Sequence, residues 1–204
     1  MGQRIVFATG NAGKMREIRA ILSDLGMEVL SMKEANVQAE IVEDGETFAE
    51  NAKIKVEAIH KCLPNDIILA DDSGLVIDCL NGEPGVYSAR YMGEETSYEL
   101  KNANLISRVN ETGDKERRAR FMCVIAAALP SGEILETSGA MEGVIAAAPA
   151  GDGGFGYDPI LYLPEFGKTS AQLSMEEKNK ISHRGKALEA MKVELKKVYG
   201  EKKA

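Results

Sequence analysis

The turn TGNAGK at residues 9–14 combines the residue types that bind phosphate. It follows a short apolar run and precedes residues at helical spacing. At such a turn, backbone N–H groups and the helix dipole attract anions, and glycines let a phosphate approach closely. It is not a Walker A loop, because Ala8 stands where that motif needs glycine and Met15 where it needs serine or threonine. We therefore predict a polyphosphate-binding turn in which Lys14 adds positive charge; the alternative is an ordinary strand-to-helix connection.

Two adjacent carboxylates, Asp71 and Asp72, follow a buried apolar run at residues 67–70. Open α/β sheets bind ligands outside the carboxyl ends of their strands. Two carboxylates in such a place are costly unless a positive charge compensates them, and a divalent metal is the usual solution. Their side chains alternate in direction, so we expect only one of them to face the metal directly. The alternative is a solvated Asp-Ser-Gly turn.

A second acidic segment, at residues 43–45, precedes a helix that is expected to begin near Thr47. Thr47 and Glu50 have the spacing of a capping box, so much of the acidity here is structural. Glu43 is the candidate for chemistry in this segment. Lys55 lies on the following helix, where a solvated lysine is the simpler interpretation.

The glycine-rich segment GGFGYDP at residues 153–159 contains two aromatic residues. Phe155 and Tyr157 suit stacking against a nucleotide base. Asp158 could form hydrogen bonds with the edge of that base. The alternative is a surface loop whose aromatic side chains lie in the core.

The segment SHRG at residues 182–185 opens the last helical pattern. Ser182 is a suitable N-cap, which places His183 and Arg184 at a helix N-terminus, where anions or carbonyl oxygens bind. A capped and solvated helix start is the alternative. Lys178 precedes this segment in an acidic and basic stretch that is typical of a charged helix face.

Composition limits the classes of function. The 204 residues are 44% hydrophobic and 28% charged, as in a globular protein of one domain or two lobes. The net charge of −7 argues against broad nucleic-acid binding but not against a small phosphate substrate. The three cysteines lie far apart and form no CxxC, which indicates reduced thiols. No apolar run is long enough for a membrane span, and no signal peptide is evident, so we expect a cytoplasmic protein.

Hydrophobic periodicity predicts an α/β protein. In the last helix, Leu188, Met191, Leu195 and Val198 are expected to face inward. Parallel strands need crossover helices, whereas the hairpin expected around residues 130–132 needs an antiparallel pair, so the sheet should be mixed. The expected strands are residues 4–8, 28–31, 67–70, 75–79, 120–129 and 134–147, and the expected helices are residues 15–25, 48–63, 100–109 and 187–199.

The motifs together resemble the inosine triphosphate pyrophosphatase family. The resemblance runs over nearly the whole chain, in order and with natural spacing. The segments that carry it are TGNAGK (9–14), EDGETFAENAKIK (43–55), ADDSGL (70–75), PGVYSARY (84–91), GGFGYDP (153–159) and SHRGKA (182–187).

This resemblance implies a single domain over residues 1–204, an elongated α/β fold with a mixed sheet flanked by helices. It implies two lobes with a central active-site cleft, a homodimer and Mg²⁺. It further implies hydrolysis of inosine, deoxyinosine and xanthosine triphosphates to the monophosphate and pyrophosphate, which keeps these nucleotides out of DNA and RNA.

The resemblance also assigns roles to residues. Asp72 matches the proton acceptor and a metal-binding carboxylate, with Glu43 as the second metal ligand and Glu40 as its alternative. Ser73 matches a substrate contact and Lys55 a phosphate contact. The triphosphate-binding turn corresponds to Thr9, Gly10, Asn11, Ala12, Gly13 and Lys14, and the nucleotide and base pocket to Phe155, Gly156, Tyr157, Asp158, Lys178, His183 and Arg184.

Two other functions are compatible with the sequence. A related pyrophosphatase that acts on modified pyrimidine or methylated nucleotides would share the phosphate turn and differ in the base pocket. A regulatory module that binds nucleotides without turnover would need the turn but not Asp72 together with Glu43. The paired acids favour the enzyme, and the missing Walker A residues disfavour a P-loop kinase or GTPase.

Overall fold

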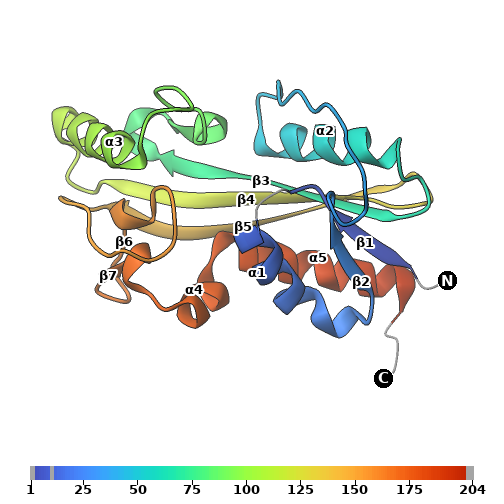
Figure 1. Cartoon of the computed structure of the whole chain (residues 1–204). Helices are drawn as coiled ribbons and strands as arrows, with labels where there is room; N and C mark the ends of the chain where they lie inside the picture. Colours follow the sequence, from blue (N-terminus) through green and yellow to red (C-terminus); the bar gives the residue numbers. More distant parts are fainter. Residues whose placement is uncertain (1–2, 10–11, 201–204) are drawn as a thin grey trace. The chain divides into compact units, whose positions relative to one another are not determined.

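The computed structural model describes residues 3–9 and 12–200, which form a mixed α/β fold (Figure 1). Within these residues, one sheet of seven strands has the order β2-β1-β3-β4-β5-β6-β7. β1 pairs in parallel with β2 and β3, whereas β6 pairs antiparallel with β5 and β7. The predicted mixed sheet is therefore confirmed.

The strands are β1 (Arg4–Phe7), β2 (Glu28–Ser31), β3 (Ile67–Ile77), β4 (Arg118–Ala128), β5 (Ile134–Ile145), β6 (Leu161–Leu163) and β7 (Lys168–Thr169). The α-helices are α1 (Ala12–Leu22), α2 (Phe48–His60), α3 (Tyr98–Thr112), α4 (Met175–Ile181) and α5 (His183–Tyr199). Short 3₁₀ turns include η4 (Asp158–Ile160) and η5 (Ser170–Gln172). No helix among the described residues is both long and apolar enough to cross a membrane.

The chain divides into two compact units. Unit 1 contains the described residues up to Asp72, residues 123–139 and the chain from Arg184 onward. Unit 2 contains Ser73–Met122 and Ala140–His183. The sequence prediction of a single domain with two lobes and a cleft stays a prediction.

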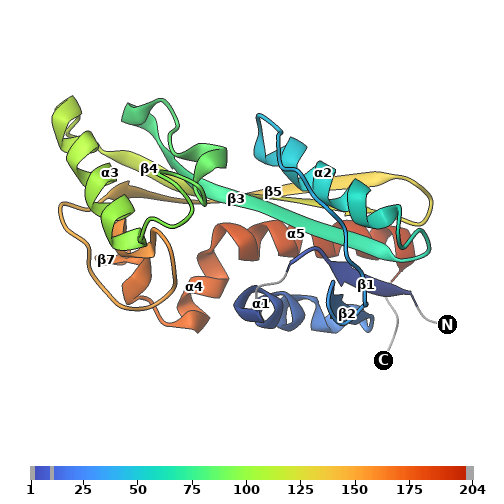
Figure 2. The same cartoon turned by 45° about the horizontal axis from the view of Figure 1, so that its top comes forward.

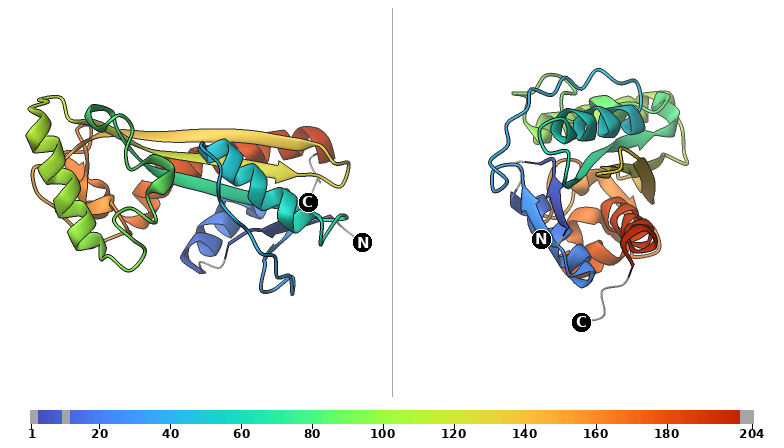
Figure 3. Two further views of the ribbon diagram at one scale, coloured as in Figure 1. Left: turned by 90° about the horizontal axis from the view of Figure 1, so that it is seen from above. Right: turned by 90° about the vertical axis from the view of Figure 1, so that its right-hand side faces the viewer.

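In unit 1, α2 covers one face of the strands and α1 and α5 cover the other (Figures 2 and 3). Each face has a buried core. The residues of β1 and β3 alternate between the faces, as the pleat of a strand requires. The core beside α1 and α5 includes Ile5, Phe7, Ile67, Leu69, Ile18, Leu22, Leu188 and Met191. The core beside α2 includes Val6, Ile68, Ala70, Ala52, Val56 and Ile59.

Unit 2 has a core of its own, formed where α3 packs on the strands of that unit. Tyr157, which lies within the glycine-rich segment, belongs to this core and is 4% exposed. The other members include Leu75, Ile77, Leu105, Val109, Phe121, Met141, Ile145, Ile160 and Leu161.

Two expectations about these elements are wrong. The Asp-Asp-Ser-Gly sequence does not end a strand, because β3 continues through it to Ile77. Asp71 and Asp72 therefore lie within the strand, not beyond its carboxyl end. Val198 is 48% exposed and does not join the core, because the buried face of α5 is completed by Leu188, Met191 and Leu195.

Candidate active site

The turn predicted to bind phosphate lies between β1, which ends at Phe7, and α1, which begins at Ala12. The Thr9 N–H donates to the Phe7 carbonyl at 2.8 Å, and the Ala8 N–H donates to the Leu69 carbonyl of β3 at 2.7 Å. Gly10 and Asn11, predicted to bind phosphate, lie outside the described residues. Ala12, Gly13 and Lys14 form the first turn of α1, which is the part of a helix that attracts anions.

Lys14 is held by the carboxylate of Asp71. The Lys14 Nζ lies 3.0 Å from Asp71 Oδ2 and 3.2 Å from Asp71 Oδ1. Arg184, at the start of α5, donates from Nε to the same Oδ2 at 3.2 Å. The Arg184 Nη1 also lies 3.4 Å from Glu17 Oε2 on α1. One buried carboxylate therefore holds two side chains that were predicted to bind opposite ends of a nucleotide.

Burial alone would favour the neutral form of Asp71, whose side chain is 2% exposed. The charges of Lys14 and Arg184 outweigh that effect, so the pKa of Asp71 is well below its usual value. Arg184 is equally buried, and the charge of Asp71 raises its pKa despite that burial. Asp71 is therefore an ionised member of an ion-paired cluster.

Asp72 belongs to a second cluster, formed with α2. The Lys55 Nζ lies 3.3 Å from Asp72 Oδ1 and 2.7 Å from Glu43 Oε2. The Asn51 Nδ2 donates to Asp72 Oδ2 at 3.2 Å. Lys55 also donates to the main-chain carbonyl of Asp71 at 3.1 Å. The predicted residues Glu43, Lys55 and Asp72 are therefore close together in unit 1.

The pKa of Asp72 is raised above its ordinary value, chiefly because the carboxyl group is buried. Lys55 and Asn51 favour the ionised form, whereas the negative charge of Glu43 opposes it. A carboxylate with a raised pKa is a better proton acceptor than an ordinary one. Asp72 thus differs from Asp71, whose pKa is lowered.

Asn51 connects the acidic segment at residues 43–45 to Asp72. Asn51 was not identified as a site residue from the sequence. Its side chain is buried, accepting from the Gly45 N–H at 2.9 Å and donating to Asp72. A Cβ on Gly45 would lie 2.8 Å from Asn51 Oδ1, so this close approach requires glycine. The signal in the sequence was the spacing of Asn51 and Lys55, which places both on one face of a helix.

Helix α2 begins with the predicted capping box. The Glu50 N–H donates to Thr47 Oγ1 at 3.1 Å, and the Thr47 N–H donates to Glu50 Oε2 at 3.0 Å. The cap fixes the first turn of α2 and so positions the chain that precedes it. Glu50 is thereby assigned a structural role, and Glu43 is the acidic residue of this region that lies beside Lys55 and Asp72.

The donor set of Glu43 and Asp72 fits a Mg²⁺ ion. Both carboxylates approach the same ammonium group, so one cation can be shared between them. In the described part of the chain, no three His, Cys, Asp or Glu side chains converge into a complete metal cage. Mg²⁺ is commonly held by one or two carboxylates together with water and substrate phosphates, so a full cage is not required.

In unit 2, the glycine-rich loop is organised around Asp158, which is 2% exposed. Its carboxylate accepts hydrogen bonds from the Phe155 N–H at 2.8 Å, from Ser170 Oγ at 2.7 Å and from Lys178 Nζ at 2.6 Å. Gly154 has a positive φ of 72°, and a Cβ there would lie 2.2 Å from Asp158 Oδ2. Asp158 therefore holds the loop together and positions Lys178.

The two aromatic residues of this loop have different surroundings. Phe155 is 58% exposed, and the Lys178 Nζ lies 5.6 Å from the centre of its ring. Tyr157 is buried, donates its hydroxyl proton to the Ser88 carbonyl at 2.6 Å and packs edge-on against Tyr98. Phe155 is consequently the aromatic side chain of the pair with a surface open to a base.

Gly156 and His183 complete the predicted base-binding residues of unit 2. The Gly156 carbonyl accepts from Asn102 Nδ2 at 3.2 Å, which ties the loop to α3. His183 is 8% exposed, and its ring stacks on Phe121 with the centroids 5.0 Å apart. Ser73 is half-buried and follows Asp72 directly in β3. Gly156 and His183 therefore both have contacts within unit 2.

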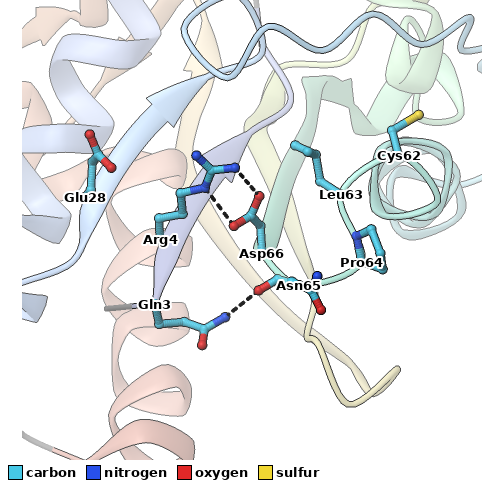
Figure 4. A pocket seen from close by; sticks show the side chains of 8 residues that line it. All are labelled: Gln3, Arg4, Glu28, Cys62, Leu63, Pro64, Asn65 and Asp66. Atoms are coloured by element: carbon cyan, nitrogen blue, oxygen red, sulfur yellow. Dashed lines mark hydrogen bonds and ion pairs between the residues drawn. The ribbon is translucent and has the colours of Figure 1, made fainter. Parts of the chain in front are cut away.

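A pocket of about 750 Å³ is lined by other residues of unit 1, beside the first residues of β1 and β3 (Figure 4). Two of its charged groups pair with each other, since Arg4 donates to Asp66 at 2.8 and 2.9 Å. The Gln3 side-chain amide donates to the Asn65 carbonyl at 3.0 Å. None of the predicted site residues lines this pocket, so its size alone does not make it the active site.

Comparisons with known proteins identify the family of this chain. Residues 5–194 match the sequence model of the Ham1 family. A dITP/XTP pyrophosphatase from Geobacter sulfurreducens is 50% identical over 191 residues, 93% of this chain and 94% of that protein. Another, from Geobacillus kaustophilus, is 46% identical over 200 residues, 98% of each chain. The solved structure of a HAM1 protein from Coxiella burnetii is 40% identical in sequence and aligns with a TM-score of 0.89. The alignment covers 96% of this chain and 100% of that protein's chain.

Proposed function

This chain belongs to the Ham1 family, and we propose that it hydrolyses ITP, dITP and XTP to the nucleoside monophosphate and pyrophosphate. The names of the similar Geobacter and Geobacillus proteins support dITP and XTP as substrates. The single observation that carries the proposal is the cluster in which Asp72, with a raised pKa, lies beside Lys55 and Glu43. Removal of pyrophosphate would keep non-standard purines out of DNA and RNA.

Asp72 acts as the proton acceptor in this proposal. Its carboxylate orients a water molecule for in-line attack on the α-phosphorus and takes up the proton that this water loses. Asn51 fixes the orientation of the carboxylate through its hydrogen bond to Oδ2. Positioning and electrostatics supply most of the rate acceleration, as in other phosphoryl transfers, and no covalent enzyme intermediate is needed.

Lys14 and Lys55 bind the β- and γ-phosphates, and the backbone of the turn at residues 9–14 contributes N–H donors. Glu43 and Asp72 are the residues that would hold Mg²⁺, for which their carboxylate oxygens are suitable ligands. When bound, the ion supplies positive charge that stabilises the phosphate oxygens as the pyrophosphate leaves. Lys55 contacts both of these carboxylates and is the cation that they share in the structure.

Lys178, His183 and Arg184 supply donors for the 6-oxo group of hypoxanthine or xanthine, and Phe155 supplies a ring for stacking. Adenine carries a 6-amino group, which would leave those donors without an acceptor. A site of this kind can reject the wrong group by up to about 10⁴-fold. Guanine shares the 6-oxo group, so its exclusion depends on the 2-position.

We also propose that the enzyme is a cytoplasmic homodimer that binds neither nucleic acid nor membrane. The dimer rests on the family resemblance. The net charge of −7 supports the absence of nucleic-acid binding, because proteins that bind nucleic acids usually carry a basic face.

The test is pyrophosphate release from ITP, dITP, XTP, GTP and ATP, each with and without Mg²⁺. The proposal predicts turnover of the first three in the presence of Mg²⁺ and little with GTP or ATP. An Asp78→Asn variant is a matched control, because Asp78 is an exposed aspartate paired with Arg120. Preference for modified pyrimidine or methylated nucleotides would identify the related pyrophosphatase instead, and binding without turnover would identify a regulatory module.

A further inference from the structure

Asp71 is a buried carboxylate with no part in the catalytic steps proposed above. It contacts one side chain from α1 and one from α5. The Oδ2 atom is shared, since the Lys14 Nζ lies 3.0 Å away and the Arg184 Nε 3.2 Å away. The two cations therefore share one oxygen atom, and Lys14 also contacts Oδ1 at 3.2 Å.

Burial makes this sharing energetically important. The side chains of Asp71 and Arg184 are 2% and 4% exposed, so water screens their interaction poorly. Removing one partner of a buried ion pair leaves the others with uncompensated charge. A movement of Lys14 away from Asp71 consequently changes how strongly Asp71 holds Arg184.

We propose that Asp71 is a positioning residue that couples the two ends of the bound nucleotide. Phosphate draws Lys14 toward itself and leaves Asp71 Oδ2 to Arg184, which fixes the guanidinium for contact with the base. Arg184 held in this way binds the base more tightly, so each end of the nucleotide strengthens recognition of the other. This inference rests on the proposed function in one respect, namely that Lys14 contacts phosphate and Arg184 contacts the base.

The two ends can be tested separately with the products, inosine monophosphate and pyrophosphate. Calorimetry with Mg²⁺ present would measure the affinity for inosine monophosphate with and without saturating pyrophosphate. Coupling between sites is reciprocal, and its typical size is about 5- to 150-fold in affinity. We expect pyrophosphate to strengthen binding of inosine monophosphate about fivefold or more in the natural protein and to have almost no effect in Asp71→Asn.

A Glu17→Gln variant is the matched control, since Glu17 contacts Arg184 Nη1 but not the shared oxygen. It should retain the coupling. A merely structural role for Asp71 would weaken both affinities in Asp71→Asn and leave their ratio intact, which would overturn the inference. If Asp71→Asn does not fold, Lys14→Gln replaces it, because coupling through the shared oxygen requires Lys14; persistent coupling in that variant would overturn the inference as well.

Failure of the inference and failure of the proposed function give different results. A natural protein that binds both products without coupling would refute the role of Asp71 and leave the pyrophosphatase activity in place. A natural protein that binds neither product would count against the proposed function itself.

Discussion

Asp71 and Asp72 are consecutive residues of β3, yet their carboxylates contact different helices. Asp71 contacts Lys14 of α1 and Arg184 of α5, whereas Asp72 contacts residues of α2. Successive side chains of a strand point to opposite faces of the sheet, and this alternation separates the two acids. The two adjacent carboxylates therefore belong to two different clusters. The pKa of Asp71 is lowered in its cluster, and the pKa of Asp72 is raised in the other.

Replacing Asp72 by Asn should reduce kcat by about a hundredfold or more, because the amide cannot accept the proton from the attacking water. The same change should not lower the melting temperature of the metal-free protein. The folded pKa of Asp72 is raised, so its contribution to stability is present below the unfolded pKa and is lost as the pH rises through the folded pKa.

At neutral pH the ionised Asp72 is therefore a destabilising group in the absence of metal, and Asn removes it. Thermal unfolding without Mg²⁺ and steady-state turnover with Mg²⁺ measure the two effects. Near-normal turnover in Asp72→Asn would remove this residue from the role of proton acceptor. A strong loss of melting temperature would show instead that the ionised carboxylate stabilises the fold.

Lys55→Gln should increase the stabilisation that the protein gains from Mg²⁺. Without the ammonium group, Glu43 and Asp72 lose their shared cation, and their mutual repulsion is then relieved by the metal. A ligand that binds only the folded state raises the melting temperature, and at a given concentration a tighter ligand raises it more. The measurement is the shift in melting temperature on adding Mg²⁺.

Lys53→Gln provides the control for this change, because Lys53 is an exposed lysine of the same helix that pairs with Glu57. Its response to Mg²⁺ should equal that of the natural protein. An unchanged response in Lys55→Gln would argue that Glu43 and Asp72 do not share the ion.

Local patterns in the sequence predicted some of this site well. The capping box of Thr47 and Glu50 forms within four consecutive residues and needs no tertiary information. The hairpin between β4 and β5 was likewise predictable from residue type and spacing. The family resemblance added the roles of residues that no local pattern could assign.

The continuation of β3 through Asp71 and Asp72 was not predictable from local sequence. Asp-Asp-Ser-Gly has the composition of a turn, and two carboxylates within a buried strand are unfavourable by themselves. The strand continues because tertiary contacts compensate the acids. One of those contacts comes from Arg184, which is 113 residues away in the chain. The strand and the charge cluster therefore depend on each other.

Arg184→Ala should reduce the preference for ITP over ATP, measured as the ratio of kcat/KM values. The guanidinium is a donor that suits the 6-oxo group and leaves an adenine amino group unpaired, and sites of this type discriminate by up to about 10⁴-fold. Arg118→Ala is the control, because Arg118 is exposed and pairs with Glu116. Unchanged selectivity in Arg184→Ala would place base recognition elsewhere.

The thiols should react with an aromatic disulfide reagent in separate phases. Cys62 is exposed, whereas Cys123 is fully buried and has a pKa raised by burial and by the nearby charge of Asp71. The thiolate is the reactive form, so Cys123 should stay unreacted until the protein is unfolded. Cys62→Ser should abolish the fastest phase. Reaction of Cys123 with the reagent under native conditions would contradict its placement in the core.

The products formed from ITP test the central claim most directly. Phosphorus NMR of the Mg²⁺-containing reaction resolves pyrophosphate from orthophosphate and the nucleoside monophosphate from the diphosphate. Attack at the α-phosphorus predicts inosine monophosphate and pyrophosphate in equal amounts, with almost none formed by Asp72→Asn. Release of orthophosphate with the diphosphate, or equal product from the natural protein and the variant, would contradict the claim.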